Sequence, residues 1–229
     1  MTFTVVPPDY FPGPELAALG FSCDVLVVAD TFQYVRQSLQ NRARLRTPTG
    51  THWITIPIRN GQYGRAICRV ETDPRSEWRR THLKAFRFNY GAAPYYEHYL
   101  PGLERVLGHD TFRLSDFTVA SLRFLLEALR CPARVLCASD LAGSPGRTID
   151  VRKHFPGMTP VLLPGQVSRD SGPDGESLRM DLDLGPYRQS FEGFEPGCSA
   201  VDLLLMHGPS AATLIREGTR LSPARSSTA

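Results

Sequence analysis

The chain has 229 residues, which by the usual size of domains corresponds to one large domain or two small ones. Its hydrophobic fraction of 41% and charged fraction of 21% are ordinary for a globular protein and exclude a collagen, a coiled coil and a wholly disordered chain. No run of about 18 apolar residues is present, so no membrane-spanning helix is predicted, and residues 1–13 lack the basic and apolar regions of a secretory signal.

The net charge of +3 hides an uneven distribution along the chain. Residues 36–87 hold twelve basic and three acidic side chains, a local balance of 12 − 3 = +9, and 24 of the 26 basic residues in the chain are arginine. The planar guanidinium suits phosphate and carboxylate groups, so this half favours an anionic ligand. A solvated basic surface is the alternative.

Five cysteines are present without a Cys-x-x-Cys pair, and an odd number cannot all pair within one chain. This usage indicates reduced thiols and a cytoplasmic protein. Cys198, which lies in a polar turn, is a weak candidate for a nucleophile.

The first predicted elements are a short buried strand at 2–6 and a short helix at 15–20. The valine-rich run at 23–30 is typical of a parallel strand that is covered on both faces. Asp30 then lies at its carboxyl end, where open α/β sheets bind ligands.

The middle of the chain predicts a hairpin and three helices. Residues 51–58 and 65–71 alternate in polarity on either side of Asn60-Gly61, which predicts a β-hairpin. The helices that follow are predicted at 76–90 with Ser76 as N-cap, at 95–107, and from Ser115 or Asp116 to just before Pro132.

The last third predicts a strand at 133–141, a helix at 148–155 and an irregular region at 156–186. Within that region 160–164 could form a strand, and 168–177 has the most disordered composition. Ser199 to Asp202 resembles a capping box that begins a helix ending at Gly208. We therefore predict an α/β fold, with a mainly parallel sheet flanked by helices and an inserted β-hairpin, in one domain (1–218) with a flexible tail (219–229).

Candidate site residues gather in residues 30–50, which combine a carboxylate with side-chain amides and arginines. Gln33, Asn41 and Arg42 could bind a polar ligand, and Arg44 and Arg46 a phosphate. The alternative is an amide network that holds an irregular connection in place.

His82 shares a helical face with Trp78 and Phe86. A neutral imidazole there could act as a general base, with Asp30 as its carboxylate partner. The alternative is a core histidine whose hydrogen bonds are satisfied.

The chain has no zinc-ligand spacing, HExxH, GxSxG or GxGxxG, so neither a metal nor a dinucleotide is predicted. Nucleic acid is disfavoured because the aromatic residues at 78, 86 and 90 follow helical periodicity and are better explained as core. Ser139 and Asp140 precede a turn between a strand and a helix, which could bind an anion.

These segments together resemble the WbqC-like protein family. The motifs are Pro8-Asp-Tyr-Phe-Pro12, Cys23 to Asp30 running into Gln33-Tyr34, Gln40-Asn-Arg-x-Arg44, Thr47-Pro-x-Gly50 with Trp53, Trp78 and His82, Asn89-Tyr90, Ala93-Pro-Tyr-Tyr96, Ser139-Asp140-Leu141, Tyr187-Arg-Gln189, and Ser199-x-x-Asp202 to Gly208-Pro209. This chain differs from the family at Val6-Pro7 (usually His-Gln), at Thr31 (usually Asp) and at Leu163-Pro164-Gly165 (usually Ser-Gly-Pro).

The resemblance implies a cytoplasmic enzyme of surface-polysaccharide (O-antigen) synthesis. It would transfer an acyl or aminoacyl group to a sugar or nucleotide-linked sugar, with a phosphorylated substrate and no identified cofactor. A non-catalytic ligand-binding or scaffold protein of the same pathway is the alternative. The expected catalytic residues are Asp30 and His82, and the expected substrate-binding residues are Gln33, Asn41, Arg42, Arg44, Tyr90, Ser139 and Asp140.

Overall fold

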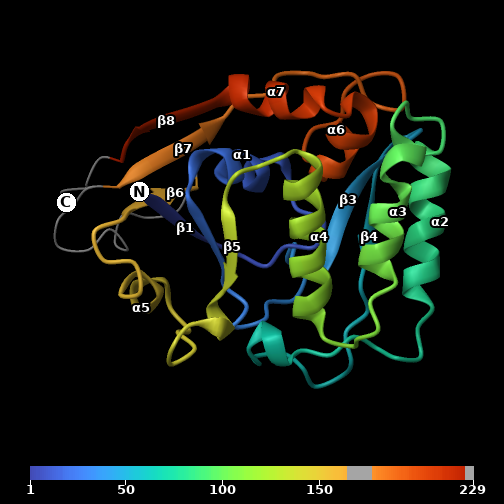
Figure 1. Ribbon diagram of the computed structural model, residues 1–229. Coiled ribbons are helices and arrows are strands. Elements are labelled where there is room, and N and C mark those ends of the chain that lie inside the picture. Colours follow the sequence, from blue (N-terminus) through green and yellow to red (C-terminus); the bar gives the residue numbers. More distant parts are fainter. Residues whose placement is uncertain (164–176, 225–229) are drawn as a thin grey trace.

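A six-stranded sheet forms the centre of the protein (Figure 1). The structure is a computed structural model that describes residues 1–163 and 177–224. The strand order is β5-β2-β1-β6-β7-β8, and only β8 is antiparallel to its neighbour. The strands are β1 (Thr2–Val6), β2 (Val25–Val28), β5 (Arg134–Cys137), β6 (Thr159–Leu162), β7 (Leu178–Leu182) and β8 (Thr219–Pro223). The predicted α/β class with a mainly parallel sheet is confirmed.

Side chains of β1 and β2 alternate between two cores, one on each face of the sheet. Val6, Leu26 and Val28 belong to the larger core, whereas Phe3 and Val27 belong to a smaller one. Burial on both faces explains why 23–30 reads as a continuous apolar run.

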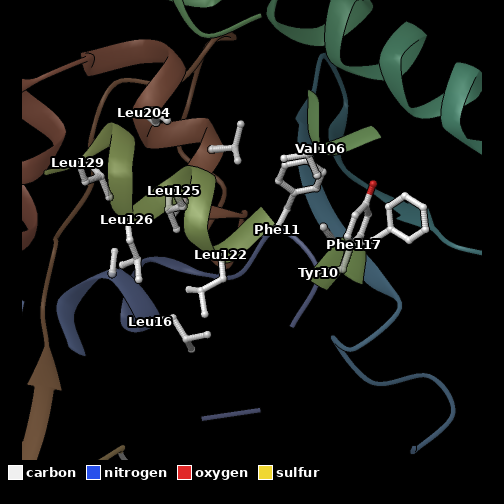
Figure 2. Packing of buried hydrophobic residues seen from close by; sticks show 14 of the residues in the cluster. Tyr10, Phe11, Leu16, Val106, Phe117, Leu122, Leu125, Leu126, Leu129 and Leu204 are labelled. Atoms are coloured by element: carbon white, nitrogen blue, oxygen red, sulfur yellow. The ribbon is translucent and has the colours of Figure 1, made fainter. Parts of the chain in front are cut away.

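Helices cover both faces of the sheet. The larger core packs against α1 (Pro14–Ser22), α2 (Trp78–Tyr90), α3 (Tyr96–Leu107), α4 (Leu114–Ala128), α6 (Ala200–His207) and α7 (Ser210–Gly218). The smaller core packs against α5 (Thr148–Arg152). Leucines of α4 lie close to Leu16 of α1 and Leu204 of α6 (Figure 2). In the described part of the chain no helix is both long and apolar enough to cross a membrane.

A separate two-stranded sheet packs beside α2. It consists of β3 (Arg42–Thr47) and β4 (Gly50–Thr55), which are antiparallel. The predicted pairing of 51–58 with 65–71 is therefore wrong: 51–55 pairs with the chain before it, and 67–69 form the short helix η1 (Ile67–Arg69). The Asn60-Gly61 turn does exist, but beyond it only the isolated bridge between Ile58 and Thr72 forms.

Several predicted boundaries are also corrected. The N-caps of α2 and α4 are Glu77 and Arg113 instead of Ser76 and Ser115 or Asp116. Residues 138–140 form the short helix η2 (Ala138–Asp140) instead of extending a strand.

The region 156–186, predicted to be mostly irregular, supplies both β6 and β7. The expected flexible tail begins with β8, whose hydrogen bonds to β7 hold it against the sheet. Residues 168–176 of the stretch predicted to be disordered, and 225–229 of the tail, lie outside the described residues.

Leu125 of α4 is fully buried in the larger core. We expect Leu125→Ala to lower the free energy of unfolding by about 2–5 kcal/mol, because the substitution loses buried apolar area and leaves a cavity. Phe88→Ala, at a side chain that is 78% exposed on α2, serves as the control and should change it by less than about 0.5 kcal/mol. Urea denaturation measures both values, and equal effects would contradict this assignment of the core.

Candidate functional site

A large cavity lies at the carboxyl ends of β2 and β5. It has a volume of about 1070 Å³, and we call it the sheet-edge cleft. Residues after β2 and β5 line one side, while η1, the segment before α4 and α4 itself line the others. Its polar and charged lining residues are Asp30, Arg69, Glu71, His109, Asp110, Thr111, Arg113, Ser115, Asp116, Arg123, Ser139 and Asp140. Parallel strands bring their carboxyl ends to one edge, which is where open α/β sheets bind ligands.

Asp30 and Ser139 are held together in this cleft. The backbone N–H of Ser139 donates to Oδ1 of Asp30 at 2.9 Å, and the Ser139 hydroxyl donates to Oδ2 at 2.5 Å. Asp30 is 3% exposed, so these bonds replace lost water and fix the carboxylate. Asp140, in the same short helix, also lines the cleft.

Three guanidinium groups line the cleft without a carboxylate partner. Arg69, Arg113 and Arg123 form no ion pair within the described residues. By contrast, Glu71 is paired with Arg59 at 2.8 Å, and Asp116 accepts a hydrogen bond from the Thr111 hydroxyl at 2.6 Å. The cleft therefore offers three guanidinium groups to an anionic group. The carboxylates of Asp30, Asp110 and Asp140, which also form no ion pair among the described residues, line the same cleft.

Two cysteines, Cys68 and Cys137, also line the cleft. Burial, together with the charge of Asp30, raises the pKa of both thiols, that of Cys137 to about 11. Burial likewise raises the pKa of the Cys198 thiol to about 12. All three are therefore protonated thiols at neutral pH, which does not favour a cysteine nucleophile.

His82 lies in the core and is not paired with Asp30. Its Nδ1 is 2.9 Å from the Tyr10 hydroxyl and its Nε2 is 3.2 Å from the carbonyl oxygen of Thr55. The residue is 3% exposed, packs against Trp78, and does not line the cleft. The predicted Asp30–His82 pair is thus wrong, and the alternative of a satisfied core histidine describes the geometry.

Asn41 and Arg42 serve the local backbone instead of the cleft. The Asn41 side chain donates to the carbonyl of Ile56 at 2.9 Å, and Arg42 donates to the carbonyl of Gln37. The Arg42 guanidinium also lies 4.3 Å from the centre of the Trp53 ring. Here the alternative interpretation, in which side chains hold an irregular connection in place, fits the contacts.

Gln33 and Tyr90 also lie outside the cleft. Gln33 is exposed and forms a backbone bridge with Ala66. The Tyr90 hydroxyl is buried and accepts a hydrogen bond from the backbone N–H of Arg46 at 2.9 Å.

Arg44 and two of the positions that depart from the family pattern line a second cavity. This cavity, of about 430 Å³, includes Pro7, Arg44 and Leu163. Of the other departures, Val6 is buried in the core, and Thr31 donates a hydrogen bond to the carbonyl of Pro145.

Sequence reasoning missed the three arginines of the cleft and Asp9 of the second cavity. A signal was present for Arg123, because positions 116, 119, 120 and 123 share one helical face opposite the leucine stripe of α4. Asp9 follows β1 in the same way that Asp30 follows β2. In the part of the chain that the structure describes, no cluster of His, Cys, Asp and Glu could hold a metal ion.

The burial of His82 predicts a dependence of stability on pH. Burial lowers the pKa of His82 to about 4, from about 6.5 when unfolded. Between these values the unfolded chain binds a proton that the folded chain does not, so stability falls as pH falls from 6.5 to 4, by about 3 kcal/mol.

We therefore expect the free energy of unfolding of His82→Gln to rise relative to that of the wild type as pH falls from 6.5 to 4, because the variant lacks this loss. The raised pKa of Asp9 acts in the opposite direction in both proteins and cancels in the difference between them. His98→Gln removes an exposed imidazole of α3 and is the control, with an unchanged profile. Denaturant titrations from pH 7 to pH 4 measure the difference, and parallel wild-type and His82→Gln profiles would contradict it.

Comparison with known proteins places these features in a family. The model of the WbqC-like protein family matches residues 7–165, a range that includes Asp30, Ser139 and Asp140. The chain is also similar to the uncharacterized protein Rv1507c of Mycobacterium tuberculosis, with 26% identity over 223 residues, which cover 93% of this chain and 96% of the relative. No solved structure matches it. The match over more than half of the chain shows that this protein belongs to the WbqC-like protein family.

Proposed function

We propose that the sheet-edge cleft binds a phosphorylated or nucleotide-linked sugar, and that the protein is a cytoplasmic transferase that adds an acyl or aminoacyl group to this sugar in surface-polysaccharide synthesis. The observation that carries the proposal is the presence of three unpaired arginines and a fixed, buried carboxylate in one large cleft. The pathway itself rests on the resemblance to the family.

The polar groups of the cleft suit both parts of such a ligand. Arg69, Arg113 and Arg123 offer forked donors that match phosphate oxygens. Asp110 and Asp140 offer carboxylate oxygens that accept hydrogen bonds from sugar hydroxyls. A volume of about 1070 Å³ is slightly above the usual range for ligand pockets, about 300–1,000 Å³, so the cleft has room for a ligand as large as a nucleotide sugar.

Asp30 is the proposed general base. A sugar amine attacks the carbonyl carbon of an acyl thioester, the new C–N bond forms, and the C–S bond breaks. Asp30 accepts the proton that the amine loses and passes it to the departing thiolate. Each carboxylate oxygen has a second lone pair free while it accepts a bond from Ser139, so both roles are compatible.

The second candidate is a protein that binds the same ligand without catalysis. The burial of His82 favours this candidate, because the expected base is absent from the cleft. The two candidates differ in whether substitution of Asp30 abolishes a reaction or alters binding alone.

The contacts of the basic half support a small ligand over nucleic acid. Arg59, Arg75 and Arg80 are paired with carboxylates, and Arg46 is buried. Fewer free charges therefore remain to follow a phosphate backbone than the sequence count indicates.

Binding of UDP-glucose, dTDP-glucose or GDP-mannose should depend on the arginines of the cleft. We expect Arg123→Ala to weaken binding about 10- to 100-fold, the usual loss when one charge-assisted hydrogen bond is removed. Arg80→Ala, outside the cleft and paired with Glu77, should leave binding unchanged. Isothermal titration calorimetry measures both, and equal affinities for Arg123→Ala and wild type would count against this site.

Substitution of Asp30 separates catalysis from binding. With acetyl-coenzyme A as donor and UDP-glucosamine as acceptor, we expect Asp30→Asn to lower the rate of N-acylation about 100-fold or more, because the base is lost. Affinity for the sugar should change little, since the amide still accepts a bond from Ser139. Asp150→Asn, at an ion pair with Arg147 outside the cleft lining, is the control. Mass spectrometry detects the product. An unchanged rate for Asp30→Asn would exclude Asp30 as the base. Binding of the sugar without turnover in the wild type would favour the non-catalytic candidate.

A further inference from the structure

The second cavity lies where β1 and β6 end. Its volume is about 430 Å³, and its walls come from the loop 7–13 after β1, the first residues of α1, Ala43 and Arg44 of β3, Leu163 after β6, and residues 197–199 before α6. It is separate from the sheet-edge cleft, with which it shares no lining residue.

The topology of the sheet marks this position. After β1 the chain passes through α1 to β2, which lies on the side of β1 away from β6. After β6 the next strand in the chain is β7, which lies on the side of β6 away from β1. The connections after two neighbouring parallel strands thus lead in opposite directions. In open α/β sheets ligands bind in the crevice outside such a pair of carboxyl ends.

Asp9 is a buried carboxyl group that faces this cavity without a partner. The residue is 7% exposed, and no hydrogen bond or ion pair to its carboxyl oxygens is formed within the described residues. Burial, with a smaller contribution from the charge of Glu15, raises the pKa of Asp9 to about 7. An unpaired buried carboxyl group is costly and rare in native proteins, and a ligand can supply the missing partner.

The loop that carries Asp9 is held in place. The backbone N–H of Tyr10 donates to the carbonyl of Leu39 at 2.9 Å, and that of Phe11 donates to the Ser121 hydroxyl at 3.0 Å. Phe11 has a φ of 39°, a strained value for a residue with a side chain, which this packing maintains. Tyr10 and Phe11 lie in the core (Figure 2), so the loop that carries Asp9 is fixed by core packing.

Arg44 supplies a positive group in the same cavity. Its guanidinium lies 4.6 Å from the centre of the Trp53 ring, and its Nε is buried without a hydrogen-bond partner. Gly197, with a φ of 76°, leaves room for it, because a Cβ there would lie 3.1 Å from an Arg44 nitrogen.

We propose that this cavity binds an apolar α-amino acid, with its ammonium group against Asp9 and Glu15 and its carboxylate against Arg44. Guanidinium binds carboxylate through two parallel hydrogen bonds. An ammonium between two carboxyl groups removes their repulsion and gives Asp9 the partner that it lacks. The apolar wall, formed by Phe11, Leu16, Leu39, Ala43 and Leu163, would pack against the ligand side chain.

This proposal does not rest on the function proposed for the sheet-edge cleft. The cavities share no lining residue, so each can bind or fail to bind its ligand independently. Binding of L-leucine should be insensitive to Arg123→Ala, and binding of a nucleotide sugar should be insensitive to Asp9→Asn.

The test is calorimetric titration of the full chain with L-leucine, L-methionine and L-phenylalanine at pH 8. We expect millimolar or tighter binding by at least one, and a loss of about 10- to 100-fold for both Asp9→Asn and Arg44→Gln. Arg42→Gln is the matched control, since Arg42 also stacks on Trp53 but lies outside the cavity, and it should bind as the wild type does.

Two analogues test the proposal on the wild-type protein, whether or not the variants fold. L-leucinamide lacks the carboxylate and 4-methylpentanoate lacks the ammonium group, so both should bind at least 10-fold more weakly than L-leucine. Affinity should also fall below pH 7, because the ammonium favours the ionised form of Asp9 and protonation of Asp9 competes with binding. No binding by any of the three amino acids, or equal binding of leucine and its two analogues, would overturn the proposal.

Discussion

The parallel pairing of β2 between β1 and β5 is the constraint on which the rest of the structure depends. Its register places Val28 beside both Val6 and Cys137, so that three strands end at the same level. Both faces of these strands are covered by apolar side chains, which leaves their carboxyl-end edge as the place where connections with polar side chains emerge. Asp9, Asp30 and Ser139 follow from that arrangement: each lies just beyond one of these strands.

The strands and helices with strong patterns could be predicted from the sequence. The valine run before Asp30 has the composition of a doubly covered strand, and residues 78–90 carry an apolar face at helical spacing. Ser199 is the N-cap of α6, as its type and position predict, with its hydroxyl accepting from the N–H of Val201 at 3.2 Å. Asp202 does not complete a capping box, since it accepts from Gln189 instead.

The hairpin could not be assigned correctly because two turn signals compete. Asn60-Gly61 is the stronger short-range signal, but Pro48 to Gly50 join two segments that pair along their full length. Ala43 and Leu45 point into the core while Arg42 and Arg44 remain partly exposed, a period of two that the density of arginine hides. Tertiary packing against α2 then decides between the two turns.

The candidate site was only partly predictable for a related reason. Periodicity places His82 on the buried face of α2, but it does not say that Tyr10, from a loop 72 residues away in the chain, will satisfy the imidazole. Nor does it show that Arg113 and Arg123 will line the same cleft as Asp30, since that depends on how α4 packs beside the sheet edge. Such partners are fixed by long-range packing, which local patterns do not contain.

Several charged groups that form no ion pair among the described residues, and the strained Phe11, lie beside the two cavities at this edge of the sheet. The exposed ion pairs elsewhere, such as that between Arg147 and Asp150, contribute little to stability, and they can be lost at little cost. A buried carboxyl group with no partner and a guanidinium with an unsatisfied Nε lower stability in the ligand-free protein. A ligand that pairs the carboxyl group and the guanidinium removes this loss of stability. The two groups that destabilise the ligand-free protein therefore contribute to the free energy of ligand binding. The unpaired groups beside these two cavities are therefore the reason to propose this edge as the functional face, whichever ligand each cavity holds.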